Sequence, residues 1–158
     1  MFRDRKGNLN MEFSGSQKVK ASQEQVFQAL LNPAVLKESI PGCSEAEFVE
    51  VPWAAGRHIR LVIALNVPGL SGSYNVFIKP EDVIEPSHLV LVSSPSSSVG
   101  TIHARCTVDL VSGGAETAVN YATEATLEGK VAAMPEFVIK TAVKSTIDRF
   151  FKNLEKHI

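Results

Sequence analysis

Four histidines are the first residues to examine for chemistry, because imidazole binds metal ions and transfers protons near neutral pH. They are His58, His88, His103 and His157, and they are spread through the chain without metal-binding spacing. Three of them fall on the outward phase of predicted strands or at a strand start. We therefore predict solvated surface histidines and no metal site.

Motifs for nucleophilic or phosphoryl-transfer catalysis are missing from the sequence, which contains no GxSxG, HExxH, GxGxxG or P-loop. The two cysteines, Cys43 and Cys106, form no CxxC pair, and we expect buried thiols. Two groups of carboxylates lie at predicted strand edges or turns, where we expect solvated side chains. These groups are Glu45, Glu47 and Glu50, and Glu81, Asp82 and Glu85. We identify no catalytic residue and predict that the protein is not an enzyme.

The composition fits one compact domain, with 158 residues, 44% hydrophobic and 21% charged. A formal net charge of -1 gives no global positive field, so we expect no nucleic-acid partner. The sequence contains neither an apolar stretch that could span a membrane nor a secretory signal, and we expect a cytoplasmic protein.

The chain changes character at Met11, where alternating apolar residues follow ten residues rich in charge. We predict a flexible tail over residues 1–10, a single domain over 11–158, and a first strand with one buried side. Its inward set is Met11, Phe13, Gly15, Gln17, Val19 and Ala21.

Two short helices are predicted after this strand. Ser22 and Gln25 have the spacing of a capping box, and Asn32-Pro33 ends the first helix and begins the second. Ile40-Pro41-Gly42 stops the second helix.

The rest of the chain has the pattern of an antiparallel meander followed by a long helix. We predict six strands, at 43–50, 57–67, 71–79, 88–94, 101–111 and 116–127. From about Met134, apolar residues recur every three or four positions to the end of the chain, as in an amphipathic helix. The predicted class is α+β, with a curved antiparallel sheet of seven strands wrapped around the long C-terminal helix.

Small residues at inward positions suggest that the helix does not fill the space beneath the sheet. They are Gly15, Gly72, Ala104, Thr123 and Ala125. Two interpretations remain open: an apolar cavity, or a packed core in which these small residues face large side chains such as Phe150 and Phe151.

Two segments of the sequence resemble the carbon monoxide dehydrogenase G-subunit (CoxG-like) family. The first, residues 14–43, contains Val-x-Ala-x-x-Glu-x-Val, Leu-Asn-x-Pro-x-x-Leu and Ile-Pro-Gly-Cys elements, and the second is YATEATLEGKVAAM at residues 121–134. Ser39 departs from the pattern, because many relatives have a second cysteine there. The chain also stops straight after the predicted long helix, without the hydrophobic C-terminal anchor of some relatives.

This resemblance implies the helix-grip fold of the START-like (SRPBCC) superfamily, in which the sheet grips the long helix around an apolar ligand cavity. It further implies a non-catalytic accessory protein of molybdenum-containing carbon monoxide dehydrogenases, with peripheral contact at the inner face of the membrane. The implied ligand is a quinone or lipid, and no permanent cofactor is expected.

We predict that the ligand cavity is lined by the two short lid helices, the inner face of the sheet and the long helix. The predicted lining residues are Phe27, Leu30, Leu36 and Ile40 on the lid, Trp53, Leu61, Ile63, Tyr74, Val76 and Tyr121 on the sheet, and Val143, Ile147 and Phe150 on the helix. Tyr74 and Tyr121 could hydrogen-bond a ligand carbonyl, or their hydroxyls could find partners within the core itself. Two alternatives remain: a cyclase- or aromatase-like enzyme using the same cavity, and a protein-docking module with a filled core.

Overall fold

One antiparallel sheet dominates the computed structural model, which describes residues 2–3, 7–52, 54–65, 72–93, 96–97 and 100–158. The sheet has the strand order β1-β2-β9-β8-β6-β5-β4-β3, and β7 pairs with β5 and β8. Seven strands are long: β2 Leu9–Val19, β3 Cys43–Val51, β4 Ala54–Leu65, β5 Gly72–Ile84, β6 His88–Ser93, β8 Gly100–Gly113 and β9 Glu116–Glu128. The predicted seven-stranded sheet is confirmed, and two strands of two residues, β1 Phe2–Arg3 and β7 Ser96–Ser97, add to it.

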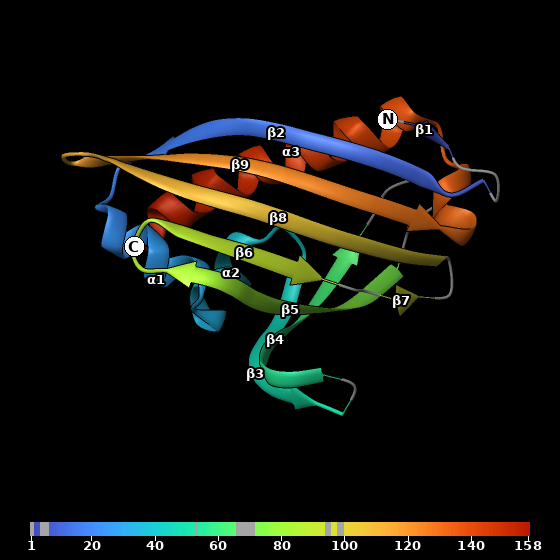
Figure 1. Ribbon diagram of the computed structural model, residues 1–158, viewed down its shortest axis with the longest axis horizontal. Coiled ribbons are helices and arrows are strands. Elements are labelled where there is room, and N and C mark those ends of the chain that lie inside the picture. The colour runs from blue at the N-terminus through green and yellow to red at the C-terminus, as the bar shows by residue number, and fades with distance from the viewer. Residues whose placement is uncertain (1, 4–6, 53, 66–71, 94–95, 98–99) are drawn as a thin grey trace.

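Three α-helices accompany the sheet in the described parts of the chain. Helices α1 Gln23–Leu30 and α2 Pro33–Ser39 separate β2 from β3, and a 3-10 turn, Gly129–Ala133, leads from β9 into α3 Glu136–Lys156. Figure 1 shows α3 lying along one side of the sheet, with α1, α2 and the C-terminus together at one end. This is the predicted helix-grip arrangement.

Local hydrogen bonds explain where the two short helices begin. Ser22 Oγ accepts from the backbone N–H of Gln25 at 3.2 Å, and Gln25 Oε1 accepts from the backbone N–H of Ser22 at 3.0 Å. Asn32 Oδ1 accepts from the backbone N–H of Ala34 at 3.0 Å, with Pro33 as the first helical residue. The predicted capping box at Ser22 is therefore confirmed, and the structure adds a cap at Asn32. Both satisfy N–H groups that have no partner within the helix.

The turn from α2 into β3 requires a glycine at position 42. Gly42 has a φ of +78°, and a Cβ on it would collide with the backbone carbonyl oxygen of Ala64. The Gly42 carbonyl also accepts a hydrogen bond from the backbone N–H of Ala64 at 2.8 Å. Close approach and positive φ together explain the glycine of the Ile-Pro-Gly-Cys element.

Two strand ends differ from the prediction. Strand β2 begins at Leu9 rather than Met11, because Leu9 pairs with Leu127 and is fully buried. Strand β5 continues through Pro80 to Ile84, although the sequence predicts a turn from Pro80. The pairing of β5 with β4 ends at Ile78, and Pro80 is paired with Leu91 of β6. Proline, which has no N–H, is tolerated where a strand is no longer paired on both sides.

The buried apolar residues in the described part of the chain form three clusters. Cluster one lies against α1 and the C-terminal part of α3, cluster two against the start of α3, and cluster three beneath α2. Leu89, Val119 and Leu154 are fully buried in the first. Leu9 and Met11 are in the second, and Ile59 and Leu61 in the third.

Candidate ligand-binding site

The inner face of the sheet, which is the side facing α3, is packed at both ends but not in the middle. Along β9, Val119 is fully buried, Tyr121 and Thr123 are half-buried, and Ala125 and Leu127 are buried again. This order of buried, half-buried and buried positions is the reverse of what a uniformly filled core gives, because the middle of a strand is normally its most protected part.

Strand β2 repeats this pattern, and β8 shares only part of it, because its half-buried inward positions continue to the beginning of the strand. In β2, Leu9, Met11 and Val19 are buried at the ends, whereas Phe13 is half-buried and Gly15 is exposed in the middle. In β8, Val108 and Leu110 are buried, but the inward positions before them are only half-buried. Those half-buried positions are Ile102, Ala104 and Cys106.

The predicted lining residues divide between the core clusters. Phe27, Leu30, Leu36, Leu61 and Tyr74 are buried. Half-buried are Ile40, Ile63, Val76, Tyr121, Val143, Ile147 and Phe150, and Trp53 lies outside the described residues. Phe150 packs against both cluster one and cluster three. The other predicted lining residues at cluster one are Phe27, Leu30, Tyr121 and Ile147, and those at cluster three are Leu36, Ile40, Leu61, Ile63 and Val76. Val143 belongs to cluster two instead.

A polar group joins the middle of the inner face to α3. Gln17 Nε2 donates a hydrogen bond to Asp148 Oδ1 at 2.8 Å, across 131 residues of sequence. Gln17 also hydrogen-bonds the side chain of Tyr121. Sequence reasoning placed Gln17 and Tyr121 on the inner face but missed Asp148, because this carboxylate lies on the exposed side of the apolar stripe of α3.

Burial governs the titration of the inner-face groups. Burial and the neighbouring Asp148 carboxylate raise the pKa of Tyr121, although the hydrogen bond from Gln17 lowers it. Burial also raises the pKa of the Cys106 and Cys43 thiols. All three groups therefore stay protonated at neutral pH, and neither thiol is an activated nucleophile.

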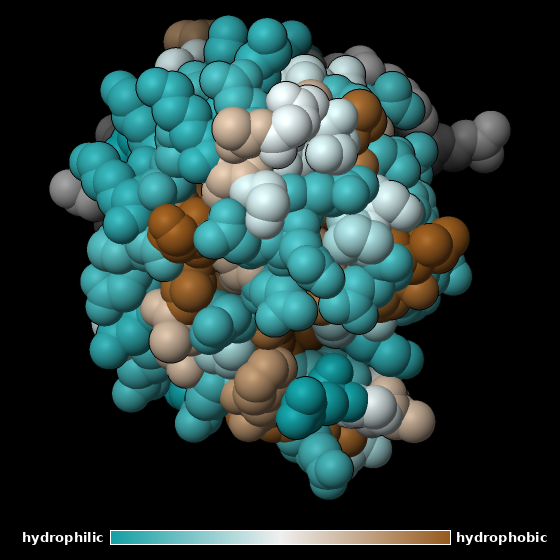
Figure 2. All heavy atoms as spheres, turned by 90° about the vertical axis from the view of Figure 1, so that its left-hand side faces the viewer, coloured by the Kyte–Doolittle hydropathy of each residue, from teal (hydrophilic) through white to brown (hydrophobic). Residues whose placement is uncertain are grey.

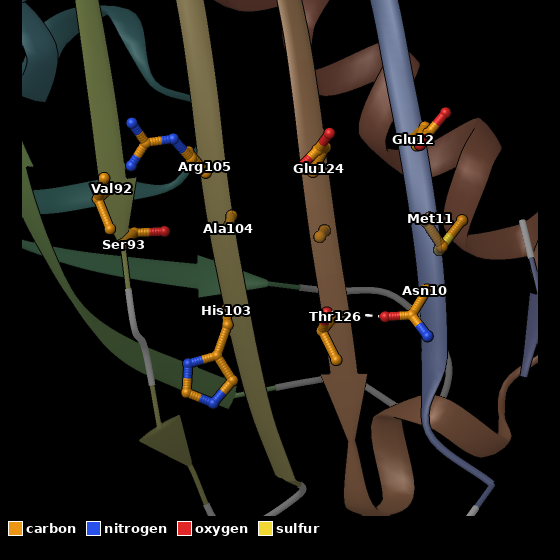
Figure 3. A pocket seen from close by; sticks show the side chains of 11 residues that line it. Asn10, Met11, Glu12, Val92, Ser93, His103, Ala104, Arg105, Glu124 and Thr126 are labelled. Atoms are coloured by element: carbon orange, nitrogen blue, oxygen red, sulfur yellow. Dashed lines mark hydrogen bonds between the residues drawn. The ribbon is translucent and has the colours of Figure 1, made fainter. Parts of the chain in front are cut away.

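The outer face of the sheet carries a groove of about 630 Å³, lined by polar and apolar residues, that sequence reasoning did not predict. Figure 3 shows its two rows of side chains on neighbouring strands. One row contains Glu12, Glu124, Arg105 and Val92, and the other contains Asn10, Thr126 and His103. Thr126 donates a hydrogen bond to Asn10 Oδ1 at 2.9 Å.

The histidines are placed differently from the prediction in one case. The sequence predicts a solvated His58, but this residue is only 5% exposed, and its Nδ1 lies 3.0 Å from the Gly56 carbonyl oxygen. Strand phase identifies the outer face but not how well that face is covered, which explains the error. His88 Nδ1 lies 2.7 Å from Asp109 Oδ1, and His103 is half exposed. Within the described residues, no group of three or more His, Cys, Asp or Glu side chains could hold a metal ion.

A model of the carbon monoxide dehydrogenase G-subunit (CoxG) family matches residues 15–158. The chain belongs to the CoxG family. The match confirms the resemblance carried by the Ile-Pro-Gly-Cys turn and the segment at residues 121–134. No curated protein matches the sequence.

Solved structures similar to this CoxG-family chain confirm the START-like fold. A conserved protein from Geobacillus kaustophilus has 26% identity and a TM-score of 0.82, over 94% of each chain. A START superfamily protein from Mycobacterium smegmatis has 15% identity and a TM-score of 0.67, over 93% of this chain and 96% of the other. The di-domain ARO/CYC protein BexL has 14% identity and a TM-score of 0.67, over 94% of this chain and 50% of the other.

The surface of the CoxG-family chain is mostly polar at the end formed by α1 and α2. Figure 2 faces this end and shows several separate apolar spots among hydrophilic side chains. Apolar residues scattered in this way are normal on a protein surface. None of the helices in the described parts of the chain is both long and apolar enough to cross a bilayer.

The buried hydroxyl of Ser39 yields a stability prediction. The Ser39 side chain is fully buried, and its hydroxyl has no hydrogen-bond partner within the described residues. Ser39→Ala removes a desolvated group without breaking a bond, so we expect the free energy of unfolding to rise by about 1 kcal/mol. Urea denaturation measures the change.

Thr117 provides the control for this prediction, because it is also fully buried but its Oγ1 donates to the Ala21 carbonyl oxygen at 2.8 Å. We expect Thr117→Val to lower the free energy of unfolding by about 1 kcal/mol. Equal losses in both variants would show that the Ser39 hydroxyl has a stabilising partner.

Proposed function

We propose that this CoxG-family chain is a non-catalytic carrier of a hydrophobic small molecule, a quinone or lipid, held between the inner face of the sheet and α3. The observation that carries the proposal is the incompletely buried middle of β2 and β9 between buried ends, with half-buried Cys106 of β8 beside it. A ligand covering those positions would remove apolar surface from water, at about 25 cal/mol per Å² before the cost of ordering it.

The partner that we propose is a molybdenum hydroxylase of the carbon monoxide dehydrogenase type, to which the carrier presents its cargo. The family supports this partner, because its description names it as a component of carbon monoxide dehydrogenase. We further propose that the exchange takes place in the cytoplasm, at the inner face of the membrane, with peripheral contact only.

The chemistry of the inner face supports carrying rather than turnover. A cyclase-like enzyme needs a general acid or base with a pKa near the working pH. The inward phenol and thiol, Tyr121 and Cys106, have pKa values raised above their usual range by burial. A carrier needs only shape, apolar contact and a few hydrogen bonds, which these groups supply in their neutral forms.

The carrier function is tested by extracting purified, detergent-free protein with organic solvent and identifying the extract by mass spectrometry. Ala104→Trp adds a large ring at a half-buried inward position of β8 and is expected to remove a stoichiometric quinone or lipid. Ala122→Trp is the control, because Ala122 is exposed on the neighbouring strand β9.

Cargo retained in Ala122→Trp but lost in Ala104→Trp supports the carrier. Because Ala104→Trp could unfold, circular dichroism must first show native secondary structure, and Cys106→Phe on the same strand provides a second block. An extract without any cargo from the wild-type protein, followed by no uptake of added quinone or phospholipid, would overturn the proposal.

A further inference from the structure

Tyr121 is held with its hydroxyl at the open middle of the inner face. A Cβ added to Gly15 would lie 2.5 Å from Tyr121 Oη and 2.9 Å from Cζ, so the phenol end passes directly over this glycine. On its other side the ring stacks on Phe151, with centroids 6.3 Å apart and planes 20° apart. Gly15 and Phe151 therefore fix where the hydroxyl points.

The Gln17 amide connects this hydroxyl to α3. One hydrogen bond from Gln17 Nε2 goes to Asp148 Oδ1 at 2.8 Å, which directs the amide nitrogen rather than the amide oxygen towards the helix. Gln17 also hydrogen-bonds the side chain of Tyr121. The amide nitrogen that Asp148 orients has a second N–H, which can occupy a lone pair of Tyr121 Oη and leave the phenol proton for a ligand.

The surroundings of this proton are apolar apart from the hydrogen-bonded group. Tyr121 packs against cluster one together with Phe150, Ile147 and Cys106. Cys106 lies on β8 next to Thr123 of β9, and the two side chains hydrogen-bond each other. A molecule placed here meets the Tyr121 O–H beside these apolar side chains, with the polar Gln17–Asp148 pair at the edge formed by β2.

We propose that the Tyr121 hydroxyl donates a hydrogen bond to a carbonyl oxygen of the bound molecule, with Gln17 and Asp148 as the positioning residues that orient it. This inference rests on the proposed carrier function and narrows its cargo to apolar molecules with a carbonyl group, such as the ring of a quinone. A hydrocarbon of the same shape gains only the apolar contacts. The polar end of the site then lies where Gln17 of β2 meets Asp148 of α3.

The test compares two probes of nearly equal shape, 2,3-dimethyl-1,4-naphthoquinone and 2,3-dimethylnaphthalene, which lacks both carbonyl oxygens. Equilibrium dialysis against the full chain, with both compartments quantified by chromatography, measures each dissociation constant. We expect Tyr121→Phe to weaken binding of the quinone by about five- to tenfold and to change binding of the hydrocarbon by less than about twofold.

The positioning role of Asp148 is tested by comparing a disruptive variant with a conservative one. Asp148→Ala removes the acceptor for Gln17, and we expect it to weaken binding of the quinone but not of the hydrocarbon. Asp148→Asn keeps an acceptor oxygen, so we expect it to bind the quinone nearly as well as the wild-type protein does. Gly15→Ala should act like Tyr121→Phe, because the new Cβ displaces the hydroxyl without deleting it. Glu155→Gln, a carboxylate further along α3, is the control and should change neither constant.

The outcomes separate this inference from the proposed function. Selective loss of the quinone in Tyr121→Phe and Asp148→Ala supports it. If Tyr121→Phe binds each probe as tightly as the wild-type protein does, the carrier function is retained but the role of Tyr121 is overturned. Equal loss of both probes in Tyr121→Phe also overturns it, since that variant then fails through packing. No binding of either probe or of added phospholipid overturns the carrier and this inference together.

Discussion

Replacing Gly42 with alanine is expected to lower the free energy of unfolding by about 3 kcal/mol, a large part of the stability of a domain of this size. Two costs add at this residue. The φ of +78° is unfavourable for any residue with a Cβ, and the new methyl group collides with the Ala64 carbonyl oxygen. Relief of that collision must move β4 away from the turn, which also stretches the hydrogen bond from Ala64 N–H to the Gly42 carbonyl. Urea denaturation of the full chain measures the loss.

Gly114 is a matched control for Gly42. Its φ is +81°, and a Cβ there would meet nothing within 4 Å. Gly114→Ala therefore carries the conformational cost alone, and we expect a loss of about 1 kcal/mol. The difference between the two variants isolates the contact with Ala64. Losses of the same size would mean that the turn relaxes freely and that the Ile-Pro-Gly-Cys element has another reason for its glycine.

Truncation of Phe151 to alanine is expected to cost about 3 kcal/mol, because a large buried ring leaves a cavity that its neighbours only partly fill. Phe151 is 9% exposed, stacks on Tyr121, and makes an edge contact with Phe150 at a centroid distance of 5.0 Å. Through Tyr121, this ring connects α3 to the middle of β9. The midpoint of urea denaturation should therefore fall strongly.

Phe137 on the same helix tests whether the loss comes from burial. It is 73% exposed, so we expect Phe137→Ala to change the free energy of unfolding by less than about 0.5 kcal/mol. Both variants remove the same ring from α3 and change helix propensity alike. If the two lost similar amounts, the stability of α3 would depend on intrinsic helix formation rather than on packing against the sheet.

The predictions that succeeded depend on interactions within a few residues. The capping box joins Ser22 and Gln25, which are three positions apart, and Pro33 begins α2 as predicted. The long strands and α3 follow from periods of two and of three to four apolar residues, which are properties of a short segment. The helix-grip order of elements follows from these local patterns and from the resemblance to the CoxG family.

The strand ends that were missed depend on partners elsewhere in the chain. Leu9 lies in a charged segment with the composition of a tail, but pairing with Leu127 buries it. Pro80 has the local signature of a strand breaker, but β4 no longer pairs with β5 there. Neither fact can be read from the neighbours of these residues in sequence.

The candidate site was predicted in part for the same reason. Alternation alone placed Tyr121, Val76 and Ile63 on one side of their strands, and the amphipathic stripe placed Ile147 and Phe150 on one side of α3. The sequence by itself thus determined which side chains face inward, because that follows from strand and helix geometry. Only the tertiary structure decided which of them pack tightly, that the middle of β2 and β9 is incompletely buried, and that Asp148 meets Gln17 across 131 residues. Those features depend on how α3 lies against the sheet, and that placement results from long-range packing that no short segment encodes.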